Sequence, residues 1–169
     1  MKILETIVSR RSIRKYTNQA VSADIVNDLL KAGMYAPSAR NQQPWHFIVF
    51  RDKQMMNNIV TVHPHASMLP TADLGILVCG DESLEKSPGY WPVDCAAATQ
   101  NILLAAHDAG LGAVWLGVYP RSERQAAIKK LFFLPAEVHP FAIIAVGYPD
   151  EKKEQPDRFN TSRIHIEKW

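Results

Sequence analysis

The sequence predicts a layered domain of the α/β or α+β class, in which helices and strands interleave along the chain. Two apolar runs, Leu74–Cys79 and His139–Gly147, have the composition of central strands that are covered on both faces. Between them, Asp94–Ala109 has the length and composition of a helix. This alternation of strand-like and helical segments is the basis for the predicted fold class.

Length and composition are those of one ordinary domain. The chain has 169 residues, of which 47% are hydrophobic, and a chain of this length buries roughly 70% of its unfolded surface. No internal repeat, low-complexity tract or Gly/Ser linker divides the sequence, so we expect a single domain over residues 1–169. The net charge of +2 excludes a general attraction to nucleic acid or to a membrane surface.

The ends and the cysteines indicate the compartment. No signal peptide follows Met1, and no apolar run approaches the ~20 residues of a membrane span. Cys79 and Cys95 are too far apart for a CxxC pair and too few for a disulfide framework. We therefore expect a cytoplasmic protein with no membrane partner, in which both cysteines are small buried residues.

The elements of the first half follow from local patterns. Apolar residues recur at helical spacing from Ser22 to Ala36, where Ser22 is a candidate N-cap and Pro37 stops the pattern. Trp45–Phe50 is rich in β-branched and aromatic residues and predicts a strand, and Asp52–Val62 predicts a weaker helix. A short amphipathic segment precedes all of these and contains Ile3, Leu4, Ile7 and Val8.

The second half contains an unusually apolar helix and a polar tail. The helix over Asp94–Ala109 is apolar around most of its circumference and is therefore either the central helix of the domain or half of a subunit interface. Ala113–Tyr119 predicts a strand and Ser122–Leu131 a further helix. The tail from Glu151 is too polar to form a core. Its large apolar residues predict that it docks elsewhere, and these are Phe159, Ile164, Ile166 and Trp169.

A basic segment near the N-terminus is the first candidate site. Arg10, Ser12 and Arg14 alternate, so an extended backbone would point them to one side. Arginine forks and a serine hydroxyl are typical donors to phosphate oxygens. The alternative is a solvated basic surface or an ion-paired helix end.

A loop between two prolines is the second candidate. Residues 36–45 (APSARNQQPW) combine small and amide side chains in a rigid connection. Such a loop suits the edges of a planar heterocycle such as a flavin or a purine. The alternative is an ordinary helix-to-strand connection.

A glycine-containing segment is the third candidate. Gly110 and Gly112 form a GxG that precedes a strand instead of following one, which excludes a Rossmann fingerprint. Gly110 is better explained as the glycine that ends a helix. Gly117, in a strand, can mark close approach of the backbone to a ligand.

The remaining motifs carry less chemistry. His63 and His65 lack a third ligand at useful spacing, so we expect free loop histidines and no metal site. His107 is interpreted as a hydrogen-bonded core group. No nucleophile–base pair is evident in the sequence. If the protein is an enzyme, we therefore expect a bound cofactor to carry out the reaction and no side chain to be catalytic.

Taken together, four segments resemble the nitroreductase family of FMN-dependent oxidoreductases. They are RRSIRKY near the N-terminus, APSARNQQPWHFIVF, DCAAATQNILLAAHDAGLGAVWLG and the ending SRIHIEKW. The resemblance runs from the first helix to the last residue and is weakest between Asn57 and Thr71. Each motif alone is weak, but four in the right order are specific.

The resemblance implies an α+β fold with a central, mainly antiparallel sheet wrapped by helices, in an intertwined homodimer. Two FMN molecules would lie at the interface, and the arm formed by residues 151–169 would embrace the partner subunit. NADH or NADPH would serve as the reductant. This arrangement would account for the apolar helix and for the apolar residues of the tail.

The same resemblance implies the cofactor-binding residues. Arg10, Arg11, Ser12 and Arg14 match the phosphate and pyrimidine contacts, and Arg163 matches an arginine that closes on the phosphate. The segment that would reach the flavin from the other subunit contains Pro37, Ser38, Ala39 and Asn41. The strand end whose backbone donors would face flavin N5 and O4 contains Trp115, Leu116 and Gly117.

Three departures from the family pattern refine these expectations. Longer members have an acidic residue where Leu116 stands, and a lysine near the place of Thr161. Only the short stretch Asp81–Val93 joins strand and helix, which favours an open, permissive pocket without a long lid and argues against a dedicated deiodinase.

The expected activity is FMN-dependent oxidation of NAD(P)H, with nitroaromatics, quinones or related small molecules as acceptors in a ping-pong cycle. Three alternatives remain at this stage. They are an enone or dehalogenating reductase of the same family, a flavin-binding or sensing protein without NAD(P)H turnover, and a nucleic-acid module built on RRSIRK. The near-neutral charge disfavours the last of these.

Overall fold

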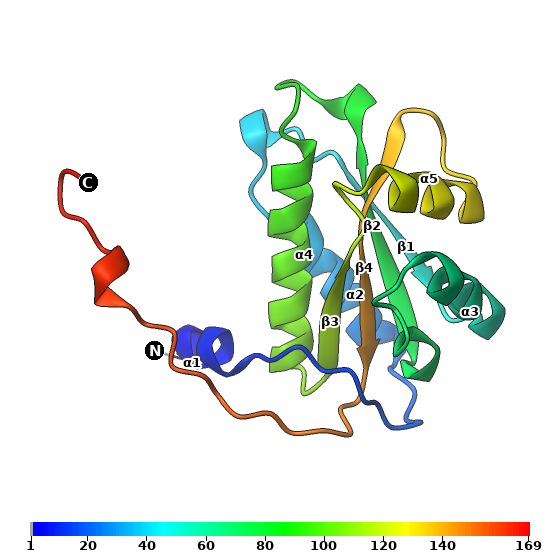
Figure 1. Cartoon of the computed structure of the whole chain (residues 1–169), viewed down its shortest axis with the longest axis horizontal. Helices are drawn as coiled ribbons and strands as arrows, with labels where there is room; N and C mark the ends of the chain where they lie inside the picture. Colours follow the sequence, from blue (N-terminus) through cyan, green and yellow to red (C-terminus); the bar gives the residue numbers. More distant parts are fainter. Residues whose placement is uncertain (1) are drawn as a thin grey trace.

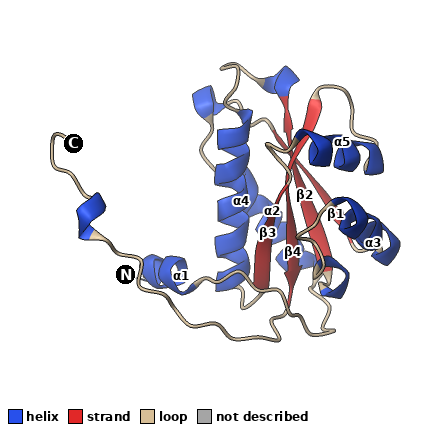
Figure 2. Cartoon of the chain, viewed as in Figure 1, coloured by secondary structure: helices blue, strands red, loops and turns tan. Residues whose placement is uncertain are grey.

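The computed structural model describes residues 2–169 and shows an antiparallel four-stranded sheet with helices on both faces (Figures 1 and 2). The strands are β1 (Trp45–Phe50), β2 (Leu74–Asp81), β3 (Gly112–Gly117) and β4 (Val138–Gly147). Their order across the sheet is β1-β2-β4-β3, and each neighbouring pair is antiparallel. The expected α+β class with a mainly antiparallel sheet is thus confirmed.

The two apolar runs form the two central strands, as predicted. β2 and β4 lie between β1 and β3, and nearly every residue along both strands is buried. Continuous burial requires apolar side chains on both faces, and this explains why neither run alternates with polar residues. β3 is an edge strand, so one of its sides has no strand partner.

One face of the sheet is covered by α2 (Ala23–Met34) and α4 (Trp91–Asp108). Ile76, Ile102 and Ile144 are fully buried in the core between these layers. As predicted, Ser22 caps α2, and its side chain accepts a hydrogen bond from the Ile25 N–H at 3.3 Å.

The opposite face is covered by α3 (Lys53–Val62) and α5 (Ser122–Leu131). Met56, Leu77 and Ile128 are fully buried in this second core. The N-cap of α3 is Asp52, whose carboxylate accepts a hydrogen bond from the Met55 N–H at 2.6 Å.

The N-terminal helix and the C-terminal arm lie apart from the sheet. α1 (Lys2–Ser9) contacts α4, and the chain after β4 extends away from the body (Figure 1). All of residues 152–169 are exposed. Four short 3-10 turns complete the elements: Ala39–Asn41, Leu69–Thr71, Glu82–Leu84 and Thr161–Arg163.

Several element boundaries differ by one to three residues from the sequence-based prediction, and two of these differences have a clear physical cause. α4 begins at Trp91, three residues before the predicted Asp94, because Pro92 stands in the first turn, where its missing N–H costs no hydrogen bond. β3 ends at Gly117 instead of Tyr119. The N–H groups of Val118 and Tyr119 both bond to the carbonyl of Phe141, at 3.0 and 2.9 Å, and this ends the regular ladder.

The glycine after α4 ends the helix as predicted. Gly110 has a φ of 76°, in the left-handed region that favours glycine. Its N–H bonds to the carbonyl of His107 at 3.1 Å, and the N–H of Leu111 bonds to Ala106 at 2.8 Å. These paired bonds are those of a Schellman motif.

Candidate functional site

The open edge of β3 presents backbone groups that the sheet does not use. The carbonyl of Ala113 accepts from the Ile13 N–H at 3.0 Å, on the side away from β4, whereas the Val118 N–H bonds to β4. Because backbone groups alternate between the two sides of a strand, the N–H groups of Trp115 and Gly117 also face the open edge. The N–H of Leu116 faces β4.

Gly117 is a glycine that the fold does not require. An added Cβ would meet only the Tyr119 carbonyl oxygen, at 3.9 Å, and φ is not positive. Each of the other seven glycines either has a positive φ or lies within 3.0 Å of another residue at its Cβ position. Gly117 therefore leaves open space beside the edge of β3, and a ligand approaching the backbone can use that space.

The carbonyl of Gly117 has two side-chain donors. His63 Nε2 lies 3.0 Å from this oxygen, and Arg124 Nη1 lies 2.6 Å from it. His63 is only 1% exposed, so the prediction of a free loop histidine is wrong for this residue, although His65 is exposed as expected. Burial lowers the pKa of His63.

The N-terminal basic segment lies beside the start of the same edge. Ser12 forms a parallel bridge with Ala113, which places the segment next to β3. The Arg11 guanidinium is occupied by backbone carbonyls, since it donates to Val8, Arg10 and Glu154. Arg11 thus ties the end of α1 to the start of the arm, and its guanidinium is less available to a ligand than those of its neighbours.

Arg10 is a half-buried cation without an acceptor. Among residues 2–169 its guanidinium makes no hydrogen bond or ion pair. Burial lowers the pKa of Arg10, and the neighbouring charges of Arg11 and Arg158 lower it further. A desolvated guanidinium among like charges is stabilised by an anion, and an anion is what the resemblance places here. The side chain of Arg14 is exposed.

His107 connects α1 to α4 at the same end of the molecule. Its Nε2 lies 2.7 Å from Ser9 Oγ, whose hydroxyl donates to the Glu5 carbonyl at 2.6 Å. The ring is hydrogen-bonded as predicted, but it is half-exposed and does not belong to the core. Partial burial and then the charges of Arg10 and Arg11 lower its pKa.

The loop between the two prolines is rigid and strained. Arg40, Asn41 and Gln43 all have φ near 50°, a left-handed conformation that costs roughly 1–2 kcal/mol for a non-glycine residue. Hydrogen bonds hold it in place: Ser38 Oγ accepts from the Gln43 N–H at 3.0 Å. Strain of this kind concentrates at functional sites.

Asp94 anchors this loop to the first turn of α4. The buried carboxylate accepts from the Ala39 N–H at 2.9 Å and from Gln42 Nε2 at 2.7 Å. Gln42 Oε1 in turn accepts from the N–H groups of Lys86 and Ser87. The exposed face of the loop includes Pro37 and Asn41.

Within one chain the predicted site residues fall into separate groups. The loop lies at the N-terminal end of α4, whereas the segment around Arg10 and Ser12 lies near its C-terminal end (Figure 1). An 18-residue helix is about 27 Å long. The structure therefore brings the basic segment together with the start of β3, and it places the loop at the other end of α4, far from that segment.

Two further predicted residues have distinct positions. The side chain of Leu116 is buried in the core under α3 and α5, while Trp115 packs on the opposite face of the sheet. Leu116 therefore directs neither its side chain nor its N–H toward the open edge, so the expected backbone donor role does not extend to this residue. Arg163 lies on the exposed arm, in the 3-10 turn Thr161–Arg163.

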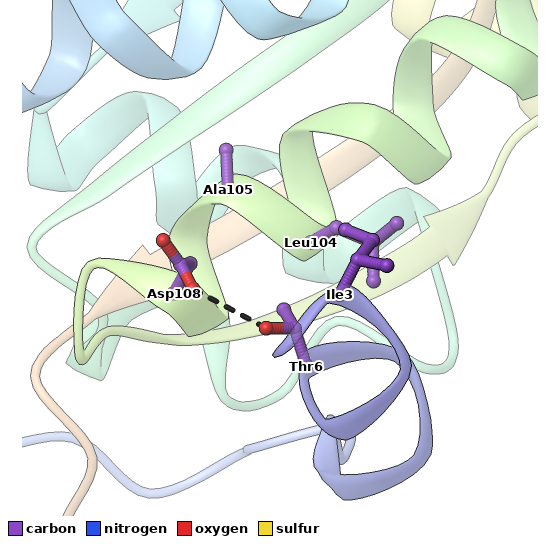
Figure 3. Close-up of a pocket in the computed structure, with 5 residues that line it drawn as sticks. All are labelled: Ile3, Thr6, Leu104, Ala105 and Asp108. Carbon is purple, nitrogen blue, oxygen red and sulfur yellow. Dashed lines mark hydrogen bonds between the residues drawn. The ribbon is translucent and has the colours of Figure 1, made fainter. Parts of the chain in front are cut away.

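Apolar surface is exposed on α1 and on the arm. Ile3 is 61% exposed, and Trp169 at the end of the arm is fully exposed. A groove of about 450 Å³ lies between α1 and α4, lined by Ile3, Thr6, Leu104, Ala105 and Asp108 (Figure 3). Thr6 Oγ1 donates to Asp108 Oδ1 across the groove at 3.2 Å.

The cysteines are buried, and the described residues contain no candidate metal cluster. Both thiols are buried as predicted, and burial raises the pKa of Cys79 to about 12 and also raises that of Cys95. Among the described residues, no group of three or more His, Cys, Asp or Glu side chains could hold a metal ion. No helix in residues 2–169 is long and apolar enough to cross a membrane.

Sequence reasoning missed the two donors to Gly117. His63 lies in a motif that was noticed but interpreted as an exposed loop, and nothing in the sequence distinguished Arg124 from other surface arginines. The roles of Asp94 and Gln42 at the loop were also not foreseen. The signal for Asp94 was its position as a charged residue in the first turn of a largely apolar helix.

Comparisons with known proteins agree with the fold and with these segments. The nitroreductase family model matches residues 7–72 and 64–148. The chain is 50% identical, over its full length and 88% of the other protein, to a Methanothermobacter thermautotrophicus protein provisionally named NADH dehydrogenase/NAD(P)H nitroreductase.

Solved structures extend this similarity. A Parabacteroides distasonis protein with the same provisional name is 40% identical and has a TM-score of 0.96, with 100% and 99% of the two chains covered. A Desulfovibrio desulfuricans protein, provisionally named a nitroreductase and solved in complex with FMN, is 33% identical. Its TM-score is 0.87, with 100% and 98% coverage. The chain belongs to the nitroreductase family.

Proposed function

We propose that this protein is an FMN-dependent NAD(P)H oxidoreductase that acts as a homodimer with FMN between the subunits. The acceptors would be nitroaromatics, quinones or related small molecules, taken in a ping-pong cycle. The names of the relatives support the cofactor and the reductant, since they include an FMN reductase [NAD(P)H] of Bacillus subtilis and an NADPH-flavin oxidoreductase of Vibrio harveyi.

The open edge of β3 is the observation that carries this proposal. It has an unneutralised, half-buried arginine near one end and a glycine with free space at the other. Ala113 and Gly117 are four residues apart, about 13 Å along a strand. An extended FMN has a length of this order between its phosphate and its ring, so the residues present fit the cofactor.

Each group at the edge has a separate task in this proposal. Arg10 and Arg14 would neutralise the phosphate, with Ser12 as a further donor, and each charge-assisted bond contributes roughly 1.5–3 kcal/mol. The N–H groups of Trp115 and Gly117 would orient the ring. FMN, when bound, would supply the redox chemistry, which is the transfer of a hydride from NAD(P)H and of electrons to the acceptor.

A second copy of the chain would complete the site. The loop containing Pro37, Ser38, Ala39 and Asn41 lies at the far end of α4 from Arg10, and in this proposal it reaches the phosphate-bound ligand from a partner subunit. The partner's arm would also bring Arg163 to the phosphate. The exposed apolar surface of α1 and the arm supports such an assembly.

An open site would explain a broad choice of acceptors. Only residues 82–90 connect β2 to α4, and they include a single 3-10 turn. This connection is too short to form a long lid over a ligand. The proposed acceptors are accordingly a class of planar, reducible molecules and not one compound.

The test is cofactor content followed by turnover. Purified protein should contain about one FMN per chain and should oxidise NADH or NADPH only when a quinone or nitroaromatic is present. Bound FMN without turnover would instead favour the flavin-binding alternative. A protein that refuses added FMN would contradict the proposal.

A further inference from the structure

Two side chains from different helices converge on a single backbone atom, the carbonyl oxygen of Gly117. His63 is the C-cap residue of α3, and Arg124 lies in the first turn of α5. Their nitrogens lie 3.0 and 2.6 Å from the oxygen. The oxygen faces the open edge of the sheet, so these donors take the place of a strand partner.

The two ring nitrogens of His63 have different roles. The N–H of His65 donates to Nδ1 at 3.3 Å, so Nε2 carries the hydrogen that is given to Gly117. The neutral ring with hydrogen on Nε2 satisfies both contacts. Because the side chain is almost fully buried, the ring is a fixed donor and not a mobile surface group.

Arg124 adds a positive charge that no carboxylate cancels. In the described part of the chain its guanidinium makes no ion pair, and the side chain is half-buried. A partly desolvated charge is screened less than one on an open surface. The positive charge of Arg124 therefore has a strong electrostatic effect on a ligand bound beside the end of β3.

The clamp matters because glycine is the residue that holds its own conformation least well. Beyond Gly117, the backbone is fixed by the bonds from Val118 and Tyr119 to the Phe141 carbonyl. The Val118 N–H and the Gly117 carbonyl belong to one planar peptide group, so the bond to Phe141 and the two donors hold this group from opposite sides. The two donors thus reinforce the end of β3 without placing a side chain in the open space.

We propose that His63 and Arg124 are positioning residues that clamp the Gly117 carbonyl and so fix the end of β3 against which the flavin binds. Arg124 also contributes a charge that favours the reduced, anionic flavin. This inference rests on the function proposed above and extends it to two residues outside the ligand-contacting segments.

The charge is tested through the midpoint potential of bound FMN in three variants of the full-length protein. Arg124→Gln should lower the potential, because removal of the cation destabilises the more negative reduced form. Arg124→Lys keeps the charge and should restore most of the wild-type potential. Arg121→Gln removes an exposed charge from the same end of α5 and should leave the potential unchanged. An unchanged potential in Arg124→Gln would overturn the assignment.

The donor role of His63 is tested without flavin. Nitrogen chemical shifts of the histidine rings in apo protein at neutral pH should show His63 as the Nε2–H form, and the Nδ1–H form would overturn the clamp. His63→Ala should raise the dissociation constant of FMN about tenfold, and His65→Ala, on the exposed neighbour, should leave it unchanged.

The two proposals fail in different ways. A wild-type protein that binds no FMN would overturn the proposed function, while the ring form of His63 would still decide whether the clamp exists. If the wild-type protein binds FMN and all the His63 and Arg124 variants have the wild-type affinity and midpoint potential, this inference is overturned and the proposed function still stands.

Discussion

At the scale of single residues, Gly117 is a glycine whose presence the fold leaves unexplained. Five of the eight glycines would place a Cβ within 3.0 Å of a neighbour, and Gly89 and Gly110 have positive φ. A Cβ at Gly117 would meet only the Tyr119 carbonyl oxygen, at 3.9 Å. We therefore explain the glycine at position 117 by a ligand that approaches the open edge of β3.

Substitution of this glycine separates folding from binding. Gly117→Ala should leave the free energy of unfolding of the apo protein within about 1 kcal/mol of wild type, because alanine fits the strand and lowers the entropy of the unfolded chain. Its FMN dissociation constant should rise at least roughly tenfold, since the methyl group would occupy the flavin position. Urea unfolding and fluorescence titration measure the two quantities.

Gly112 provides the matched control on the same strand. A Cβ there would lie 2.6 Å from Ile13 Cγ2, so Gly112→Ala should destabilise the fold by about 1–3 kcal/mol. If Gly117→Ala binds FMN as tightly as the wild type does, then no ligand occupies the space beside Gly117.

Burial of His63 makes stability depend on pH. Its pKa is lowered in the folded state, as is that of His107, so both bind protons more readily when the chain is unfolded. The free energy of unfolding should therefore fall as the pH drops below the ordinary histidine pKa of about 6.5. The stabilisation is fully present above that pH.

The measurement is urea unfolding at about pH 7.5 and about pH 5.5. His63→Gln keeps a donor for Gly117 but cannot take up the proton, so its stability should change less between the two pH values. If the free energy of unfolding of His63→Gln falls as much between the two pH values as that of the wild type, then His63 does not contribute to the pH dependence. His107→Gln measures the share of the other histidine.

At the scale of elements, α4 organises the molecule through three polar residues spaced seven apart. Asp94 holds the strained loop, Asn101 Nδ2 donates to the Ala32 carbonyl of α2 at 3.0 Å, and Asp108 accepts from Thr6 of α1. These three residues thus attach α4 to three different neighbours, the loop, α2 and α1.

Removal of the Asp94 carboxylate should release the loop. Asp94→Ala leaves the buried donors of Ala39 and Gln42 without acceptors, which costs roughly 1–3 kcal/mol for each unsatisfied group. Urea unfolding should show this loss, and proteolysis within residues 37–43 should become faster. Asp94→Asn retains one acceptor and should lose less. Equal stability of Asp94→Ala and wild type would contradict the anchoring role.

The sequence predicted the elements better than their contacts. The two buried strands, the cap at Ser22 and the terminal glycine of the long helix each depend on local composition, which is readable along the chain. The convergence of His63 and Arg124 on Gly117 depends on how α3 and α5 pack, so residues 54 and 7 positions away in the sequence meet only in the folded protein. Arg11 was grouped with its neighbours because sequence alone does not show a guanidinium directed at backbone carbonyls.

At the scale of the whole molecule, the described chain leaves apolar surface without a cover. Phe159 and Ile166 on the arm are 77% and 85% exposed, and the outer face of α1 is apolar as well. Surfaces of this kind are typical of subunit interfaces. They support the proposal that the loop and the basic segment meet across a dimer.

Shortening the arm tests this assembly. Removal of residues 157–169 keeps the bonds from Lys153 to Ser12 and from Arg11 to Glu154, so the body should still fold. The shortened protein should dissociate to monomers at concentrations where the full chain is dimeric, and it should retain less FMN. Sedimentation velocity and absorbance at the flavin band measure both. A shortened protein that stays dimeric with full FMN content would contradict the role of the arm.

The central claim is that this chain holds a flavin that NAD(P)H reduces, and its most direct test is anaerobic titration of the purified protein with NADH and NADPH. We expect a yellow protein whose flavin absorbance is bleached by about one equivalent of reductant per bound FMN and restored by a quinone. The double variant Arg10→Ala/Arg14→Ala should be nearly colourless, because the phosphate loses its two cations. A yellow wild-type protein that neither nucleotide bleaches would contradict the claim.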